Sequence, residues 1–283
     1  MARDSIMKSE ITQLFDQIDN VPQVPEVVRI LLSQVNDPNI DFIAIAKNVE
    51  KEQVIAIKIL RLANSAFYGV PREIGSINQA LVILGMTELK KLILTSGLIS
   101  AIPNIPNLNI EDFWIDNFRT ASYAKWIADN ANLTDSDMVF TAGLINGLGN
   151  ILIHLGNAAA AEEINYLVED GMPRINAEQQ ELGFSNQEAC AELCRQWHFS
   201  DDLISAVEQS GAPLSFEQPS LSSCAVFVAR YISESNYSEK TAAEKLADFP
   251  LTEWKKLGLK KENIKENMAE ILMLETGLEG LLD

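Results

Sequence analysis

Residues that start and stop helices recur along nearly the whole chain, and they limit the possible folds more than any other feature. Ser76 and Gln79 have the spacing of a capping box, in which two side chains satisfy free amides of the first helical turn. Ser185 and Glu188 repeat that spacing, and Gly85 follows an apolar periodic segment as a helix end. The intervals between such marks are mostly about 10–18 residues, an ordinary helix length. The sequence therefore predicts an all-α protein with more than ten helices and no strand.

Prolines mark the main internal boundary. Pro103 and Pro106 lie in a stretch that cannot continue a helix, because proline lacks an amide hydrogen and constrains the residue before it. We expect this stretch to be a hinge or a rigid spacer. The predicted division is an N-terminal helical bundle over residues 1–105, a second helical half over residues 106–235, and a charged helical C-terminal extension over residues 236–283.

Finer helix positions are also expected. The C-terminal extension should hold helices over Glu239–Ala247 and Asn263–Thr276, because both segments have helical spacing of their apolar residues. Thr134 or Ser136 should cap the helix that follows them, since a hydroxyl can accept from a free amide of the first turn.

The charge of the chain excludes several classes of partner. Lys and Arg number 22 and Asp and Glu number 40, which gives a formal net charge of −18 spread along the sequence. A protein this acidic repels phosphate backbones and anionic lipid at long range. We therefore expect neither nucleic acid nor a membrane as a partner.

The apolar and cysteine content favours a cytoplasmic protein. No cationic segment followed by an apolar run marks a secretory signal, and no apolar run reaches the ~20 residues that span a bilayer. Cys190, Cys194 and Cys224 make an odd number, which argues against a disulfide framework and for a reducing compartment. We expect all three to be buried structural thiols.

Several motifs follow one another in the N-terminal half. They are Val24-Pro25-Glu26-Val27-Val28, Asn36-Asp37-Pro38, Leu62-Ala63-Asn64-Ser65-Ala66-Phe67-Tyr68-Gly69 and Ile77-Asn78-Gln79-Ala80-Leu81. Together they resemble the HDOD family, the HD-related output domain of bacterial signalling proteins, from about Asp16 to about Pro213. The resemblance implies an N-terminal helical bundle packed against a degenerate HD-domain-like helical half. It also implies a bacterial, cytoplasmic, regulatory setting.

The resemblance also implies where an HD-type metal site would lie. Phosphohydrolases of the HD superfamily carry adjacent His and Asp ligands, and those positions fall here on Asn146 and Gly147. Neither residue can hold a divalent cation. The remaining ligand positions fall near Asp116, Asn186 and the pair Ser210 and Gly211. One carboxylate does not make a metal site, so we expect no metal, no cofactor and no catalytic residue.

The two histidines do not replace the missing ligands. His154 lies about two helical turns beyond Asn146, roughly 12 Å along the axis, and is expected to be packed or to cap a helix. His198 follows Trp197 at an expected helix end, where a cation is mildly favoured by the helix dipole. We expect neither histidine to be catalytic.

Two groups of residues remain as candidate sites. Asp116, Asn146, Asn186 and Ser210 form a vestigial pocket if they converge, and otherwise are solvated or locally hydrogen-bonded. The motif residues Asn64, Ser65, Phe67 and Tyr68 form either a rigid corner between the two halves or a surface that faces a ligand or partner.

Three functions stay open at this point. The leading interpretation is a non-catalytic signal-transduction module that acts through other signalling proteins, and a homo-oligomer is also open. The alternative is a small-molecule sensor, with a nucleotide-type ligand in the vestigial pocket, which would need arginines such as Arg119 or Arg61 to face inward. The third is a metal-dependent phosphohydrolase with substitute ligands.

Overall fold

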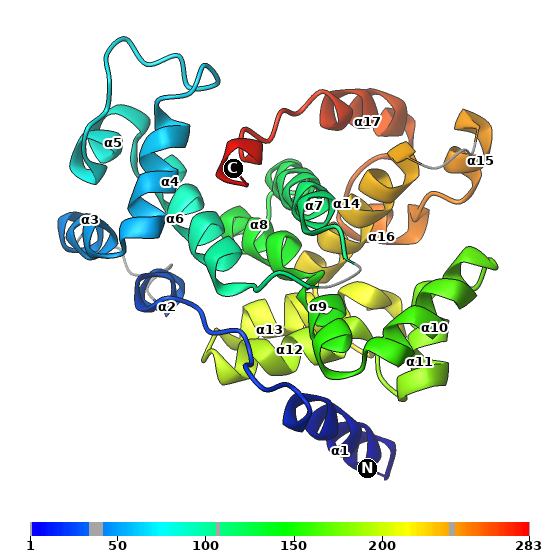
Figure 1. Ribbon diagram of the computed structural model, residues 1–283. Coiled ribbons are helices and arrows are strands. Elements are labelled where there is room, and N and C mark those ends of the chain that lie inside the picture. The colour runs from blue at the N-terminus through cyan, green and yellow to red at the C-terminus, as the bar shows by residue number, and fades with distance from the viewer. Residues whose placement is uncertain (1, 34–41, 106–107, 238–240, 283) are drawn as a thin grey trace. The chain divides into compact units, whose positions relative to one another are not determined.

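The structure is a computed structural model that describes residues 2–33, 42–105, 108–237 and 241–282 (Figure 1). Every regular element in these ranges is an α-helix or a 3₁₀ helix, so the predicted all-α class is confirmed. The chain divides into two compact units. The larger unit comprises Met1–Val21, Ile105–Gln196 and Asp201–Leu274, and the smaller unit comprises Pro22–Asn104, Trp197–Ser200 and Glu275–Asp283.

The larger unit is organised around helix α7 (Ile110–Asn130), which packs most extensively against α8 (Ser136–Ile145) and α14 (Leu221–Tyr237). Trp114 and Phe118 of α7 are almost completely buried. A Cβ at Gly143 of α8 would lie 2.7 Å from the Cα of Ala121, so the two helices approach closely enough to require glycine there. The other described helices of this unit are α1 (Ala2–Asp16), α9 (Leu148–Gly156), α10 (Ala158–Glu169), α11 (Arg174–Leu182), α12 (Asn186–Gln196), α13 (Asp201–Glu208), α15 (Ala242–Ala247), α16 (Leu251–Lys256) and α17 (Ile264–Leu272), with 3₁₀ turns η1 (Gln209–Gly211), η2 (Pro213–Ser215) and η3 (Lys261–Asn263).

The smaller unit is organised around α6 (Met86–Ala101), which packs against α2 (Glu26–Ser33), α4 (Gln53–Ala63) and α5 (Ile77–Leu84), while α3 (Phe42–Lys51) packs on α4 and α5. Every residue from Leu92 to Leu98 is buried, so α6 is enclosed on most sides. A Cβ at Gly97 would overlap the side chain of Val28, which places α2 directly against α6. Burying a large aliphatic side chain contributes about 1.5–3 kcal/mol, so this helix holds much of the unit's stability.

The C-terminal segment, defined here as residues 275–282, belongs to the smaller unit. It ends in the 3₁₀ turn η4 (Glu279–Leu281), which packs on α4. Lys58 Nζ donates to the carbonyl of Leu281 at 2.5 Å, and Arg61 Nη2 donates to the carbonyl of Gly280 at 2.9 Å. Leu278 and Leu281 are completely buried. The segment is therefore held by both apolar burial and cationic donors at free carbonyls.

Several predicted helix boundaries agree with the structure. Ser76 accepts from Gln79 N at 3.2 Å, and Ser185 with Glu188 forms both bonds of a capping box. The expected helices in the extension are found as α15 and α17, although residues 238–240 lie outside the described residues.

The expected cap of α8 is wrong. Asp135, which lies between the predicted Thr134 and Ser136, accepts from Met138 N at 2.8 Å. Aspartate caps as well as serine does and adds a favourable charge at the helix N-terminus. Ser136 instead receives a bond from Lys125 Nζ at 3.1 Å.

The units and the predicted division differ in part. Asn104 ends one unit segment and Ile105 begins another, next to the predicted boundary at residue 105. Residues before Pro22 group with the larger unit, and the predicted extension is split after Leu274. Pro106 lies outside the described residues, so a hinge or spacer there stays a prediction.

Candidate functional site

The turn between α8 and α9 is closed by amides. Asn146 is buried, and its Nδ2 donates to the carbonyl of Gly143 at 2.8 Å and lies 3.5 Å from Asn117 Oδ1. The backbone amide of Gly147 donates to the same Asn117 oxygen at 3.3 Å. The two positions where HD phosphohydrolases carry ligands therefore belong to a local hydrogen-bond network in this chain.

A side chain at Gly147 would crowd two neighbouring side chains of α7. A Cβ there would lie 2.9 Å from Asn117 Oδ1, 3.0 Å from Asn117 Nδ2 and 3.0 Å from a ring carbon of Phe113. Asn117 is itself anchored, because its Nδ2 donates to the carbonyl of Phe113 at 2.7 Å. A Cβ at Gly149 would overlap the backbone carbonyl of Asn186. The glycines of this segment are points of close contact, and the side chains of Asn117 and Phe113 would have to shift to admit an aspartate at position 147.

A cavity of about 590 Å³ lies beside this turn, and we call it the pocket. Three of the four residues predicted to converge, Asp116, Asn146 and Asn186, line it. Ser210 is not among the lining residues, because it is completely buried and its Oγ donates to the carbonyl of Val207 at 2.7 Å. The remaining lining residues are Phe113, Asn117, Thr120, Gly147, Asn150, Pro173, Arg174, Ile175, Gln187, Gly211, Phe227, Arg230, Ser233 and Glu234.

A buried carboxylate fixes one wall of the pocket. Glu178 is completely buried and accepts from Asn186 N at 2.9 Å and from Asn186 Nδ2 at 2.8 and 3.0 Å. Burial raises the pKa of Glu178, while the bonds from Asn186 and the charge of Arg174 oppose the rise. Asn186 therefore has its amide held in place, and its orientation in the pocket wall is set by Glu178.

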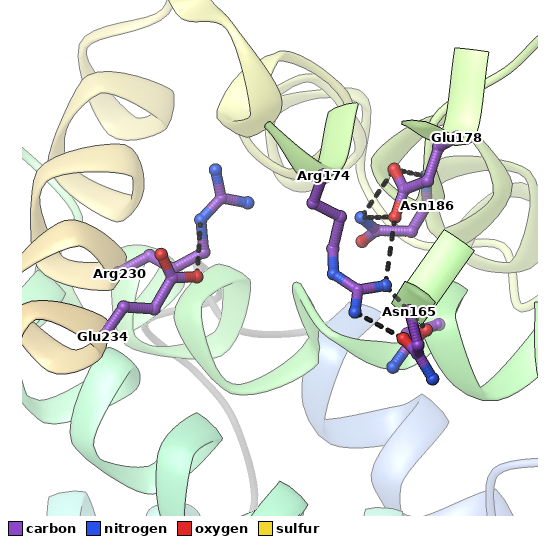
Figure 2. Close-up of polar contacts among 7 residues, drawn as sticks. Asn165, Arg174, Glu178, Asn186, Arg230 and Glu234 are labelled. Atoms are coloured by element: carbon purple, nitrogen blue, oxygen red, sulfur yellow. Dashed lines mark hydrogen bonds and ion pairs between the residues drawn. The ribbon is translucent and has the colours of Figure 1, made fainter. Parts of the chain in front are cut away.

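Two arginines line the pocket from different helices, as Figure 2 shows: Arg174 at the start of α11 and Arg230 on α14. Arg174 donates to Asn165 Oδ1 at 2.7 Å and lies 3.8 Å from Glu178. Arg230 Nε lies 3.6 Å from Glu234, and its guanidinium carbon lies 5.8 Å from the centre of the Phe227 ring. The pocket therefore has one cation on α11 and one on α14.

Two further groups give the pocket its electrostatic character. Burial raises the pKa of Asp116, Arg119 opposes the rise, and the charges of Asp112 and Glu234 add to it. The hydroxyl of Ser233 is buried and has no hydrogen-bond partner among the described residues. An unsatisfied buried hydroxyl is uncommon in a folded protein, so this oxygen is available to a bound molecule.

The pocket residues do not fit a metal ion. Within the described ranges, no three His, Cys, Asp or Glu side chains are grouped so that they could share one. The carboxylates that line the pocket are Asp116 and Glu234, and each is paired with an arginine, Arg119 at 3.7 Å and Arg230 at 3.6 Å. An HD-type centre needs several anionic or imidazole ligands converging on the ion.

A family model for the HDOD domain matches residues 21–213 of this chain. The chain belongs to the HDOD family. The matched range agrees with the range of about 16–213 that the motifs indicated, so the predicted family is confirmed.

Two solved structures share the fold of this HDOD chain, and one curated protein is similar to it in sequence. A solved structure from Shewanella amazonensis SB2B, provisionally assigned as a phosphohydrolase, is 27% identical, with a TM-score of 0.77 over 95% of this chain and 97% of that one. One from Marinobacter aquaeolei VT8, provisionally assigned to signal transduction, is 17% identical, with a TM-score of 0.79 over 99% of this chain and 66% of that one. An uncharacterized protein of Treponema pallidum (strain Nichols) is 22% identical over 202 residues, 68% of this chain but 38% of that protein. This chain thus spans well under half the length of that curated relative.

The HDOD motif residues form a local corner in the smaller unit. Asn64 Nδ2 donates to the carbonyls of Leu60 and Ile74, both at 2.8 Å, and Asn64 Oδ1 accepts from Ile74 N at 2.7 Å. This side chain therefore joins the end of α4 to the loop that precedes α5. Ser65 has a buried hydroxyl with no partner among the described residues.

The aromatic residues of the motif have different surroundings. Tyr68 donates to Glu88 Oε1 at 2.6 Å, and burial together with this carboxylate raises the pKa of the phenol. Phe67 is 47% exposed and stacks edge-on against Tyr68 with ring centres 5.0 Å apart. Its ring lies directly against Gly277 of the C-terminal segment, where a Cβ would overlap it.

The histidines and cysteines lie outside the lining of the pocket. His154 is buried on α9, and its pKa is lowered by burial and by the charge of Arg174. His198 is exposed and has a positive φ of 59°. Cys190, Cys194 and Cys224 are free and buried, as expected of structural thiols; Cys190 Sγ donates to the carbonyl of Ile145 at 3.1 Å.

Sequence reasoning missed both arginines of the pocket. It named Arg119 and Arg61 as the cations that a ligand would need, but Arg119 pairs with Asp116 and Arg61 binds the C-terminal segment. Arg174 follows Pro173 at a helix start, a position where a basic residue is unfavourable to the helix dipole. That mismatch was the one local signal that pointed to Arg174, and we find none for Arg230.

One apolar stretch of the described residues, Ser136–Gly156, is long and apolar enough to cross a membrane by composition. It comprises α8, the turn at Asn146 and Gly147, and α9, and 78% of its most apolar window is buried within the protein. The stretch is therefore a core element of the fold, as a buried apolar helix pair should be.

Proposed function

We propose that this HDOD protein is a non-catalytic signal-transduction module that acts by binding another signalling protein. The observation that carries the proposal is the turn at Asn146 and Gly147, where neither residue can hold a divalent cation and the Gly147 amide is bound to Asn117. A pocket whose residues do not fit a metal ion lacks the group with which HD phosphohydrolases activate water. The helical fold can still present a surface to another signalling protein.

The surface that we propose for a partner lies on α4 and α5. Val54 and Ile57 of α4 are 61% and 65% exposed, and Val82 of α5 is 81% exposed. Val54 and Ile57 are three residues apart and so lie on one side of their helix, and α4 packs against α5. Strongly exposed aliphatic side chains on two helices that pack together make these helices our candidate for the interaction surface. We place this interaction in the cytoplasm, with another protein rather than nucleic acid or membrane as the partner.

Two measurements test this proposal. Purified protein should contain no stoichiometric Mn, Fe, Ni or Zn and should not hydrolyse phosphodiesters. The presence of such a metal, or hydrolysis of a phosphodiester, would overturn the non-catalytic role. Cross-linking in cells should recover a specific partner with the wild-type protein but not with Val82→Asp. Met273→Asp is the matched control, because Met273 is 82% exposed and lies in the larger unit. Equal recovery with Val82→Asp would remove this surface from the proposal.

The pocket favours a second candidate function, a small-molecule sensor. Its volume of about 590 Å³ falls within the range of about 300–1,000 Å³ of ligand sites. Its wall combines the aromatic ring of Phe113 with the amides of Asn117 and Asn146 and with two arginines. Such a mixture of apolar area and a few oriented polar groups is characteristic of a ligand site.

A further inference from the structure

Arg230 lies beside Glu234 through only one of its three guanidinium nitrogens. Its Nε pairs with Glu234 at 3.6 Å, and its side chain is 24% exposed. Figure 2 shows the two terminal nitrogens pointing away from Glu234. Glu234 is 71% exposed, so water screens this pair and weakens it. The terminal nitrogens have the planar geometry that binds two oxygens of a phosphate or carboxylate.

Arg174 supplies a second cation that is already held in place. Asn165 accepts from its Nη2 at 2.7 Å, and the buried carboxylate of Glu178 lies 3.8 Å from its Nη1. These partners keep the guanidinium oriented before a ligand arrives, which lowers the entropic cost of binding. Arg174 contributes positive potential on α11, and Arg230 is the better placed direct ligand for an anion.

Ser233 is an independent observation that points to a ligand site. It lines the pocket, is 2% exposed, and its hydroxyl has no partner in the part of the chain that the structure describes. It lies three residues after Arg230 on α14, so the two side chains share one side of the helix. A ligand oxygen that binds Arg230 can therefore also accept from Ser233, which would satisfy the buried hydroxyl.

The rest of the wall limits the ligand to a ring with a single strongly anionic group. Phe113 and Phe227 line the pocket and offer aromatic faces for stacking with a planar base. Asp116 and Glu234 also line it, and with a net charge of −18 on the chain they disfavour a polyphosphate. The carboxylate of Asp116 can also accept an N–H donor from a base.

We propose that the pocket binds a nucleoside monophosphate, with the phosphate on Arg230 and Ser233 and the base against the aromatic wall. This inference rests on the sensor function proposed above and names its ligand class. No bond is made or broken, and the nucleotide is held and released intact.

Isothermal titration of the full chain with AMP and GMP tests the proposal. One of the two should bind at least about tenfold more tightly than its nucleoside, than inorganic phosphate and than its triphosphate, because each charge-assisted bond contributes about 1.5–3 kcal/mol. Binding of inorganic phosphate as tight as that of AMP and GMP would overturn the proposal, since no base would then be recognised. Absence of binding at millimolar concentration would also overturn it.

Variants with opposite expected effects separate binding from folding. Arg230→Gln should weaken binding by at least about tenfold, whereas Glu234→Gln should strengthen it, because the arginine loses a competing carboxylate. Arg29→Gln is the matched control, since Arg29 is an exposed arginine paired with Glu26 in the smaller unit. Equal affinity in all three variants would overturn the assignment of Arg230.

Failure of this inference can be told apart from failure of the proposed function. A protein that captures its partner, contains no metal and binds no nucleotide would retain the signalling role and lose the inference. A nucleotide that binds and is recovered intact by chromatography supports both. A bound nucleotide that is hydrolysed would keep the site and overturn the non-catalytic role.

Discussion

At the scale of single residues, the pocket is shaped by a position that lacks a side chain. The backbone of Gly147 lies so close to Asn117 and Phe113 that a Cβ would sit 2.9 to 3.0 Å from their atoms. The space that metal ligands need is therefore filled by an anchored amide and an aromatic ring. Restoring the ligand residues alone should not restore a metal site.

Gly147→Asp tests this reasoning. We expect a loss of about 1–3 kcal/mol of folding free energy, because the added side chain overpacks a buried turn. The double change of Asn146→His and Gly147→Asp should still bind no Mn or Fe, measured by metal analysis after dialysis. Stoichiometric metal in the double variant would show that the side chains of Asn117 and Phe113 shift readily and that our account of the turn is wrong.

Glu178 is the second residue with a clear expected effect. Its carboxylate accepts two bonds from the Asn186 side chain and one from the backbone. Glu178→Gln places an N–H group where acceptors are needed and should destabilise the protein by about 2–3 kcal/mol in urea denaturation. Glu181→Gln, an exposed change on the same helix, should alter stability by less than about 0.5 kcal/mol.

His154 predicts how stability depends on pH. Its pKa is lowered in the folded protein by burial and by Arg174, whereas an unfolded histidine has a pKa of about 6.5. Below that pH the unfolded chain binds more protons, so stability falls as pH drops from 7 towards 5. His154→Leu should reduce this dependence in denaturant titrations at both pH values.

The candidate site shows what motifs predict and what they miss. Asp116, Asn146 and Asn186 could be placed together because the family's ligand order fixes which positions face the pocket. The prediction for Ser210 was wrong by one residue. Gly211 lines the pocket, whereas the Ser210 hydroxyl donates to the carbonyl of Val207. The arginines come from α11 and α14, where no sequence pattern records that the two helices border the same cavity.

At the scale of elements, local capping chemistry accounts for most helix boundaries. The capping boxes were predictable because spacing and residue type determine them within a few residues. The cap of α8 was not, because Thr134, Asp135 and Ser136 are all good caps and tertiary packing chooses among them. Close helix contacts at Gly97 and Gly149 were also beyond prediction, since they depend on a helix far away in sequence.

Asn64 should be a structural residue of the α4 corner. Its side chain makes three hydrogen bonds that join Leu60 to the loop at Ile74. Asn64→Ala should therefore lower stability by about 2 kcal/mol in thermal or urea denaturation. Asn48→Ala is the control, because Asn48 makes one exposed bond to Lys51 on α3 and should have little effect. Equal stabilities of the two variants would contradict the corner role.

At the scale of the whole molecule, the smaller unit is formed by segments that lie far apart in the sequence. The smaller unit is built mainly from residues 22–104 but includes the C-terminal segment, whose leucines are buried and whose carbonyls bind Lys58 and Arg61. The charged character of the predicted extension gave no indication of this return, because a contact with a residue 223 positions away leaves no local pattern in the sequence.

Removal of residues 275–283 should therefore destabilise α4 selectively. Loss of two buried leucines alone amounts to about 3–6 kcal/mol of apolar burial. Hydrogen exchange should rise in α4 and at Phe67, while α7 and α8 keep their protection. A double change of Lys58 and Arg61 to methionine should give a smaller effect, since it spares the leucines. Unchanged exchange in α4 after truncation would show that the segment is not needed there.

The bond between Lys58 and Leu281 spans 223 positions of the sequence. During synthesis α4 leaves the ribosome long before its cover exists, and Leu62 and Phe67 are then accessible to chaperones and to other nascent chains. The packing around this helix is thus completed only after residues 275–282 have been synthesised, and refolding rates should reflect the search for that distant segment.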